Sequence, residues 1–363
     1  MVNLRQDDGE SGVAFYLPPP RPAPGAAVAL LSASSAAFGR FPRRTARAEG
    51  ALREALGRPV RLVSEAEFPG IVAGSAKARA NALRHLMEDP EVGLVMFSVG
   101  GFNSNDMLEH MASWAAQAPR KPLVGYSDST AVLLGYQAMT QAVVFYGAAA
   151  LPQFGEWPRP HRESVDSLVT TVLDGRPGEW ALPDWYTQQD TDWAAGDEFV
   201  RASYGPAKPL VVREGTGGGV LFGGNLPTIN LLAGTAWWQP PEGPTVLAVE
   251  ATATSGQPEA MRRWLRHIRH LGLLDQVTAV LIGRVPIAPL LPRRTEDLAA
   301  LVLDLLPPGI PVVADMPFGH TDPILTLPIG SPVAVTADST GVSVRTLTET
   351  VLDASPAVKP DER

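Results

Sequence analysis

A serine, a glutamate and a histidine each follow a short apolar run that predicts a β-strand. They are Ser127, Glu250 and His320, in this order along the chain. These residue types can act together in acyl transfer: the serine attacks a carbonyl carbon, the histidine takes and returns the proton, and the carboxylate orients the imidazole and stabilises its charged form. The order is that of α/β-hydrolases, although the triad recurs on unrelated folds in other orders. We therefore take the three as candidate catalytic residues.

The segment around Ser127 reads as an apolar strand at Leu123 and Val124, a tight turn, and then a helix over residues 131–139. A serine at this position lies at a helix N-terminus, where the helix dipole and free N–H groups favour developing negative charge. The segment resembles the nucleophile elbow Gly-x-Ser-x-Gly, except that Ser129 replaces the second glycine. The alternative is that Ser127 or Asp128 only caps the helix. Both interpretations hold together if the Asp128 side chain caps the helix and its N–H serves the oxyanion, which leaves Ser127 free to attack.

Two glycines, Gly100 and Gly101, directly follow another predicted strand at residues 92–98. The carboxyl ends of parallel strands share one edge of a sheet, so these glycines are expected at the same edge as Ser127. Glycines let the backbone approach a ligand closely and offer N–H groups to an oxyanion. The alternative is a tight strand-to-helix turn with no ligand.

The elements that must position these residues alternate between strand and helix, which predicts an α/β fold with a doubly wound parallel sheet. In the first half we expect strands at 26–31, 60–63, 92–98, 123–124 and 143–146, and helices at 43–56, 76–87, 107–116 and 131–139. In the second half we expect strands at 220–224, 245–250, 277–282, 312–314, 332–336 and 342–346, and helices at 226–232, 261–271 and 298–306.

We expect five regions: a proline-rich leader that is flexible or else extends a sheet edge, an N-terminal domain with the nucleophile, a connecting region, a C-terminal domain with the glutamate and histidine, and a polar tail. Their bounds are 1–24, 25–160, 161–207, 208–350 and 351–363. The connecting region is rich in Pro, Trp and Asp, and long loops of this kind are often lids or binding loops. Its tryptophans either pack on the body of the protein or stack on a planar ligand. They are Trp180, Trp185 and Trp193.

The composition narrows the class of protein. Apolar residues make up 45% and charged residues 19% of the 363, as in globular proteins, and the net charge of −8 argues against a nucleic-acid partner. The chain has no cysteine, which excludes disulfides, thiolate zinc sites and a cysteine nucleophile and fits a reducing compartment. No signal peptide or membrane-spanning run is visible. We expect a cytoplasmic protein that works without metal or cofactor.

Four motifs together resemble the LD-carboxypeptidase family of serine peptidases, and the resemblance runs from about residue 26 to residue 344. They are Gly125-Tyr126-Ser127-Asp128, Gly223-Gly224-Asn225-Leu226, Glu250 after its apolar strand, and Phe318-Gly319-His320-Thr321 with Leu327-Pro328-Ile329-Gly330. The resemblance implies a triad of Ser127, Glu250 and His320 and an oxyanion hole from backbone N–H groups at Gly100, Gly101 and Asp128. It also implies a flavodoxin-like N-terminal domain, a C-terminal domain of swivelling β/α/β type, a site between the domains, and a homodimer.

Two branches of this family differ in substrate. One cleaves L,D-peptide bonds of murein peptides; the other is similar to microcin C self-immunity peptidases, which cleave the amide that joins an aminoacyl or peptidyl group to a modified adenylate. Val99 stands where the murein branch has an arginine, and the following Gly-Gly-Phe-Asn-Ser-Asn resembles the immunity branch. The resemblance therefore favours a small aminoacyl- or peptidyl-nucleotide substrate over a muropeptide. The expected substrate-binding residues are Asn103, Ser104, Trp185, Trp193 and Asn225.

A function of a different class stays open from the residues alone: a non-catalytic protein that binds a small molecule on the same scaffold. The two hypotheses differ in one geometric requirement. In the enzyme, Ser127 and Glu250 must each lie within hydrogen-bond reach of His320, on opposite ring nitrogens.

Overall fold

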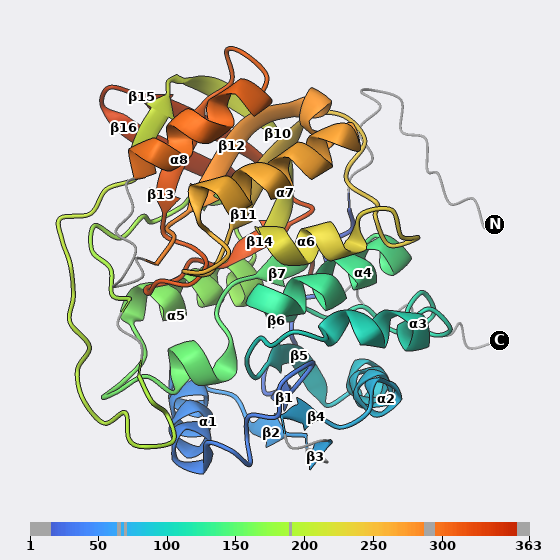
Figure 1. The fold of residues 1–363 in the computed structure, drawn as a ribbon. Coiled ribbons are helices and arrows are strands. Elements are labelled where there is room, and N and C mark those ends of the chain that lie inside the picture. Colours follow the sequence, from blue (N-terminus) through green and yellow to red (C-terminus); the bar gives the residue numbers. More distant parts are fainter. Residues whose placement is uncertain (1–15, 64–66, 69–70, 189–190, 287–294, 354–363) are drawn as a thin grey trace.

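A computed structural model describes residues 16–63, 67–68, 71–188, 191–286 and 295–353. Two large β-sheets, each covered by helices, form the protein (Figure 1). The α/β fold class expected from the sequence is confirmed. No helix in the described part of the chain is long and apolar enough to span a membrane.

The first sheet has the strand order β14-β7-β6-β5-β1-β2. Its first five strands in chain order are parallel, and their arrangement is that of flavodoxin-like doubly wound sheets. The strands are β1 (Ala27–Leu31), β2 (Val60–Leu62), β5 (Val92–Phe97), β6 (Leu123–Gly125), β7 (Val144–Tyr146) and β14 (Leu327–Ile329).

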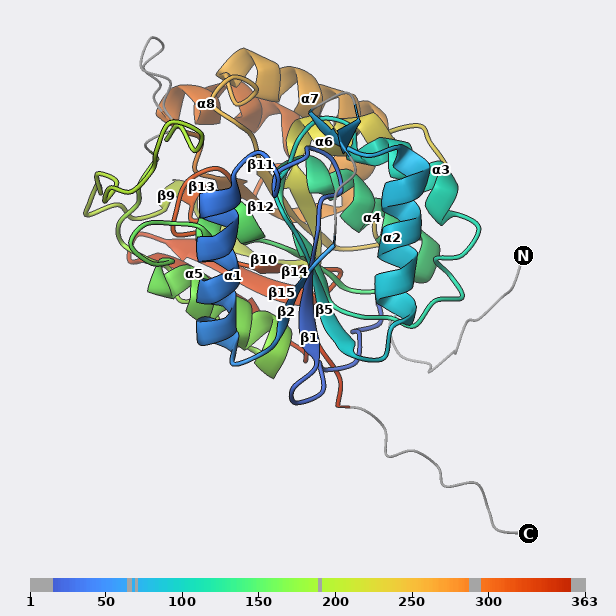
Figure 2. The ribbon, with the colours of Figure 1, turned by 90° about the horizontal axis from the view of Figure 1, so that it is seen from below.

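Helices cover both faces of this sheet; α1 and α2 lie on opposite sides of it (Figure 2). The helices of this half are α1 (Pro42–Leu56), α2 (Ala76–Glu88), α3 (Leu108–Met111) and α4 (Thr130–Thr140), with 3₁₀ turns η1 (Ser104–Met107) and η2 (Ser127–Ser129). A two-stranded ribbon, β3 (Glu67–Phe68) and β4 (Val72–Ala73), lies beside them. The helix expected at 107–116 is shorter than predicted, because the chain continues in turns after Met111.

The second sheet has the order β8-β16-β15-β10-β11-β12-β13-β9. Its centre, β10 to β13, is parallel, and antiparallel strands flank it on both sides. The strands are β8 (Gly178–Glu179), β9 (Leu210–Arg213), β10 (Gly215–Asn225), β11 (Thr245–Glu250), β12 (Val277–Gly283), β13 (Val312–Met316), β15 (Pro332–Asp338) and β16 (Gly341–Thr346). The helices are α6 (Leu226–Leu232), α7 (Pro258–His270) and α8 (Thr295–Val302), with 3₁₀ turns η5 (Leu273–Gln276) and η6 (Leu303–Leu305).

Strand β10 begins earlier than the sequence predicts, because the run Gly215–Gly219 is part of the strand and not a loop before it. Glycines are needed here because neighbouring backbone lies very close. A Cβ atom on Gly219 would lie 2.1 Å from the carbonyl oxygen of Pro244, and one on Gly223 would lie 1.7 Å from that of Ala248. The strand thus holds β11, and with it Glu250, in close register.

Strand β14 joins the two halves of the chain. It comes from the region expected to form the C-terminal domain, yet it pairs antiparallel with β7 of the first sheet, Leu327 opposite Tyr146. It follows the segment that contains His320. The motif Leu327-Pro328-Ile329 was predicted as a family signature and not as a strand, so this crossing was missed.

The described part of the expected flexible leader is packed against the body. Tyr16 is buried, Leu17 forms a parallel bridge with Ala142, and Pro20 forms one with Leu352. For residues 16–24 the structure therefore agrees with an extension that pairs with the body and not with a flexible leader. This proline-rich extended segment satisfies N–H groups by pairing with the residues just before β7 and near the C-terminal end of the described chain.

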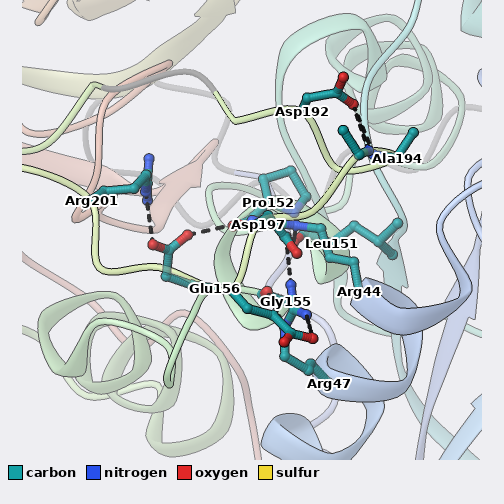
Figure 3. A network of polar contacts seen from close by, with 12 residues as sticks. Arg44, Arg47, Leu151, Pro152, Gly155, Glu156, Asp192, Ala194, Asp197 and Arg201 are labelled. Atoms are coloured by element: carbon teal, nitrogen blue, oxygen red, sulfur yellow. Dashed lines mark hydrogen bonds and ion pairs between the residues drawn. The ribbon is translucent and has the colours of Figure 1, made fainter.

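Segment η3 (Ala150–Phe154) precedes the connecting region, which starts with α5 (Arg162–Leu168) and η4 (Val169–Asp174); η3 and η4 are π-helical. Its irregular remainder is held by a buried ionic network (Figure 3). Arg44 of α1 forms ion pairs with Asp197 and Glu156, and Arg201 pairs with Glu156 at 2.8 Å. Trp193 packs edge-on against Phe41 and lies 4.3 Å from the Arg44 guanidinium.

Candidate active site

Ser127 lies in the tight turn between β6 and α4. Its φ of 57° is in the left-handed region, which few residues other than glycine adopt. Its N–H donates a hydrogen bond to the Tyr146 hydroxyl at 3.0 Å. The turn directs the Ser127 hydroxyl to His320, with Ser127 Oγ 2.9 Å from His320 Nε2.

The alternative that Ser127 or Asp128 caps the following helix is wrong. The Asp128 carboxylate accepts a hydrogen bond from the N–H of Ser104 at 2.9 Å, and the Ser104 hydroxyl donates to the Asp128 carbonyl oxygen. The Asp128 side chain therefore binds the start of η1, a neighbouring turn, and not its own helix. Thr130 instead donates its hydroxyl proton to the Ser127 carbonyl oxygen at 2.7 Å.

The other ring nitrogen of His320 contacts the glutamate: His320 Nδ1 lies 2.6 Å from Glu250 Oε2. An ionised carboxylate only accepts hydrogen bonds, so Nδ1 carries the proton and Nε2 of the neutral ring accepts from the Ser127 hydroxyl. The Tyr126 ring, 5.1 Å from the imidazole, packs beside it. The three side chains thus form one hydrogen-bonded chain with Ser127 and Glu250 on opposite nitrogens.

Glu250 is the last residue of β11 and is fully buried. Burial acts to raise the pKa of its carboxyl, but the charge and hydrogen bond of His320 and the hydrogen bonds from Tyr146 and Asn225 outweigh burial and lower the pKa. Oε1 accepts from the Tyr146 hydroxyl at 2.6 Å and from Asn225 Nδ2 at 2.8 Å. The carboxylate is therefore held in its ionised form.

The glycine pair lies against the serine. A Cβ atom on Gly100 would lie 2.8 Å from Ser127 Cβ and 2.9 Å from its Oγ, so only a glycine leaves room for the hydroxyl there. Gly101 has φ 156° and lies against Ser34, whose hydroxyl accepts from the N–H groups of Phe102 and Asn103. Within the described residues, no hydrogen bond engages the N–H groups of Gly101 or Asp128.

The residues expected to bind substrate have contacts within the protein. The Asn103 side chain accepts from Ser34, and Ser104 is buried against Asp128. Asn225 uses both ends of its amide, because Nδ2 donates to Glu250 and Oδ1 accepts from the N–H and hydroxyl of Thr228 at the start of α6.

The tryptophans also contact the protein. Trp185 donates its Nε1–H to Glu163 at 2.9 Å and packs edge-on against His161. Trp180 donates to Thr346, and Trp193 packs in the ionic network described above. These side chains thus make the packing contacts that the sequence analysis named as one alternative, and ligand stacking by Trp185 or Trp193 stays a prediction.

Two contacts of the site were not predicted. Tyr146 at the end of β7 contacts Ser127 and Glu250, and Asp322, two residues after His320, binds the connecting region. Its carboxylate accepts from Arg201 at 2.6 Å and from Gln153 at 3.0 Å, and its backbone pairs with that of Thr187. The signal for Tyr146 was present, because it ends the strand after the one that leads to Ser127.

The described residues contain no group of three or more His, Cys, Asp or Glu side chains that could hold a metal ion.

The sequence matches the description "LD-carboxypeptidase N-terminal domain" over residues 28–147 and "LD-carboxypeptidase C-terminal domain" over residues 218–335. It is 30% identical over 279 residues to the putative carboxypeptidase YocD of Bacillus subtilis, covering 74% of this chain and 80% of that protein. It is 28% identical over 276 residues to the microcin C7 self-immunity protein MccF of Escherichia coli, covering 75% and 79%.

Solved structures share the fold. MccF in complex with aspartyl sulfamoyl adenosine matches with a TM-score of 0.80 at 24% identity, over 93% of this chain and 100% of that one. An MccF-like protein from Bacillus anthracis str. Ames matches with a TM-score of 0.80 at 24% identity, over 91% and 99%. The two-sheet arrangement described above is thus shared with these proteins over nearly their whole length.

Proposed function

Because the chain belongs to the LD-carboxypeptidase family of serine peptidases, it is a hydrolase, and we propose that Ser127, His320 and Glu250 are its catalytic triad. The observation that most directly supports this proposal is the pair of hydrogen bonds on His320: 2.9 Å from Nε2 to Ser127 Oγ and 2.6 Å from Nδ1 to Glu250 Oε2. A non-catalytic binding protein would not need both bonds on opposite nitrogens.

In this mechanism Ser127 Oγ attacks the carbonyl carbon of a carboxamide while His320 Nε2 takes its proton. The resulting imidazolium is stabilised by Glu250, which stays ionised because its pKa is lowered. His320 then gives the proton to the leaving nitrogen, and the C–N bond breaks to leave an acyl-enzyme. Water, activated by the same imidazole, attacks the ester and releases the acid and free Ser127.

The tetrahedral intermediate needs hydrogen-bond donors for its oxyanion. We propose that these donors are the N–H groups of Gly101 and Asp128, which donate no hydrogen bond to a described residue. Each directly follows one residue of the close Gly100–Ser127 pair. Asp128 N is also in the first turn before α4, where the helix dipole favours negative charge.

For the substrate, we propose the carboxamide bond of an aminoacyl- or peptidyl-adenylate conjugate. The relative MccF is named a self-immunity protein to microcin C7, and one of its structures contains aspartyl sulfamoyl adenosine. In this chain the connecting region, which pairs with the His320 segment through Thr187 and Asp322, also offers aromatic surface. Tyr186 stacks on Tyr204, which is 45% exposed. Such rings suit a planar base.

The alternative substrate is a murein tetrapeptide with an L,D-peptide bond, because the relative YocD is named a putative carboxypeptidase. A paired assay separates the two. Release of sulfamoyl adenosine from an aminoacyl conjugate supports the first substrate, and release of D-Ala from the tetrapeptide supports the second.

The same assay tests the triad. We expect Ser127→Ala to lower kcat by roughly 10⁴-fold or more with an unchanged melting temperature, because the nucleophile of a triad is lost. The control is Ser113→Ala, an exposed serine of the same half that hydrogen-bonds only to the His110 carbonyl oxygen, and it should retain full activity. Full activity of Ser127→Ala would contradict the assignment.

A further inference from the structure

We propose that Tyr146 is a positioning residue of this site: its hydroxyl joins the backbone of the nucleophile to the carboxylate that orients the histidine. The proposal rests on the proposed function of Ser127, His320 and Glu250. Tyr146 Oη lies 3.0 Å from Ser127 N and 2.6 Å from Glu250 Oε1. The five groups therefore close a ring of hydrogen bonds: Ser127 Oγ, His320, Glu250, Tyr146 and Ser127 N.

The direction of each bond in this ring is fixed by chemistry. Ionised Glu250 can only accept, so the Tyr146 O–H must donate to it. The Ser127 N–H can only donate, so the same hydroxyl accepts from it through a lone pair. Tyr146 is fully buried, and burial together with the neighbouring Glu250 charge raises the pKa of its phenol well above the usual value. The hydroxyl thus stays protonated and remains a donor across the working pH range.

The position of Tyr146 in the sheet makes this bridge possible. Strand β7 lies between β6 and β14 (Figure 1). In the register, Tyr146 is opposite Gly125, two residues before Ser127, and opposite Leu327, in the strand that follows the His320 segment. Tyr146 therefore lies between β6, which leads to Ser127, and β14, which follows His320. Its side chain reaches Glu250 of the second sheet.

The turn at Ser127 needs such a partner. Ser127 has a left-handed φ of 57°, so the strand pairing of β6 does not continue through it. The Tyr146 hydroxyl is the acceptor for its N–H. Without it, that N–H and one acceptor position on Glu250 both lose their partner. We expect the serine hydroxyl and the imidazole then to lose their mutual alignment, although packing of the ring is unchanged.

The test is Tyr146→Phe, which removes only the hydroxyl. Its control is Tyr136→Phe: Tyr136 is equally buried, in α4, but makes no hydrogen bond to Ser127, Glu250 or His320. Each variant and Ser127→Ala are reacted with a fluorophosphonate, which needs no knowledge of the substrate. The probe forms a bond from Ser127 Oγ to phosphorus, fluoride leaves, and His320 accepts the serine proton.

We expect Tyr146→Phe to react with the probe roughly 10- to 100-fold more slowly per folded molecule, because small misplacements of catalytic groups have effects of this size. Tyr136→Phe should match the wild type. In a plot of labelling rate against pH, the fall in rate at low pH (the acid limb) should move to higher pH. With one hydrogen-bond donor fewer on Glu250, more negative charge faces His320, so the protonated, inactive form of His320 persists to higher pH.

A purely structural role for Tyr146 would lower the melting temperature but leave the labelling rate per folded molecule and the pH profile unchanged, and that result would overturn the proposal. If Tyr146→Phe does not fold, 3-fluorotyrosine at position 146 replaces it. This stronger donor should move the acid limb to lower pH, and an unmoved limb again overturns the proposal. Labelling of wild-type protein at a residue other than Ser127 would instead contradict the triad itself.

Discussion

At the residue scale, the contact between Gly100 and Ser127 sets a steric limit on the site. Gly100 does not have a left-handed φ, so its backbone conformation is open to alanine, and the only obstacle is the space occupied by the serine side chain and Asp128 N. A side chain at position 100 would therefore act by crowding Ser127 and not by straining the backbone.

We expect Gly100→Ala to lower kcat at least about 100-fold, because its methyl group would displace the Ser127 hydroxyl from His320. The control is Gly50→Ala in α1, where a Cβ meets nothing within 4 Å. It should keep full activity and gain about 0.5–1 kcal/mol in the free energy of unfolding. Steady-state kinetics and urea unfolding of both variants check this prediction. A wild-type kcat for Gly100→Ala would show that the turn can move to accept the methyl group without displacing the Ser127 hydroxyl.

At the scale of elements, the buried ionic network decides where the connecting region lies. Arg201 joins Glu156 of the first half to Asp322 in the histidine segment, and all three side chains are almost fully buried. A buried pair that loses one partner leaves an uncompensated charge, whereas an exposed pair contributes little.

We expect Arg201→Ala to lower the free energy of unfolding by about 3–5 kcal/mol. Arg162→Ala removes an exposed i,i+4 pair with Asp166 in α5 and should cost only about 0.3–0.5 kcal/mol. Because Asp322 is close in sequence to His320, we also expect kcat to fall in Arg201→Ala and not in Arg162→Ala. Equal losses of stability in urea titrations of the two variants would contradict this view of the network.

The elements themselves were largely predictable. Strand β11 was predicted with its observed bounds, because an apolar run that ends in a charged residue is a clear pattern. Strand β14 was missed because its three residues, which include Pro328, are too few to show an alternation of apolar and polar side chains. Its pairing with β7 also depends on the distant half of the chain. The early start of β10 was missed because Gly215–Gly219 has loop composition, and its need for glycine comes from strands that pair with it in space.

At the scale of the whole molecule, two sheets share one site and one strand. Ser127 follows the carboxyl end of β6 in the first sheet, Glu250 ends a strand of the second, and β14 connects the C-terminal half to the first sheet. Ser127, Glu250 and His320, which the structure brings together, could be selected from the sequence because their types and strand-end positions are local. The strand-end position of Tyr146 is a local signal. Its contacts with Ser127 and Glu250, and that of Asn225 with Glu250, were not predicted, because hydrogen bonds between separate strands leave no local pattern. The expected homodimer remains a prediction.

We expect the protein to unfold in a single cooperative transition, although chains with two domains often do not. The shared strand and the buried Glu250 mean that neither sheet keeps its core and polar contacts if the other unfolds. Calorimetric and van't Hoff enthalpies should therefore agree. Two resolved transitions in the calorimetric trace would show that the halves are independent.

The crossing of β14 also has a consequence for the newly synthesised chain. Tyr146 leaves the ribosome long before Leu327, by on the order of ten to thirty seconds at ordinary rates of translation. During that interval the nascent first sheet has Ser127 but neither His320 nor its final edge strand, so the proposed triad is incomplete and one side of β7 is open to pairing with other chains. Hydrolytic activity therefore begins only when almost the whole protein has been made.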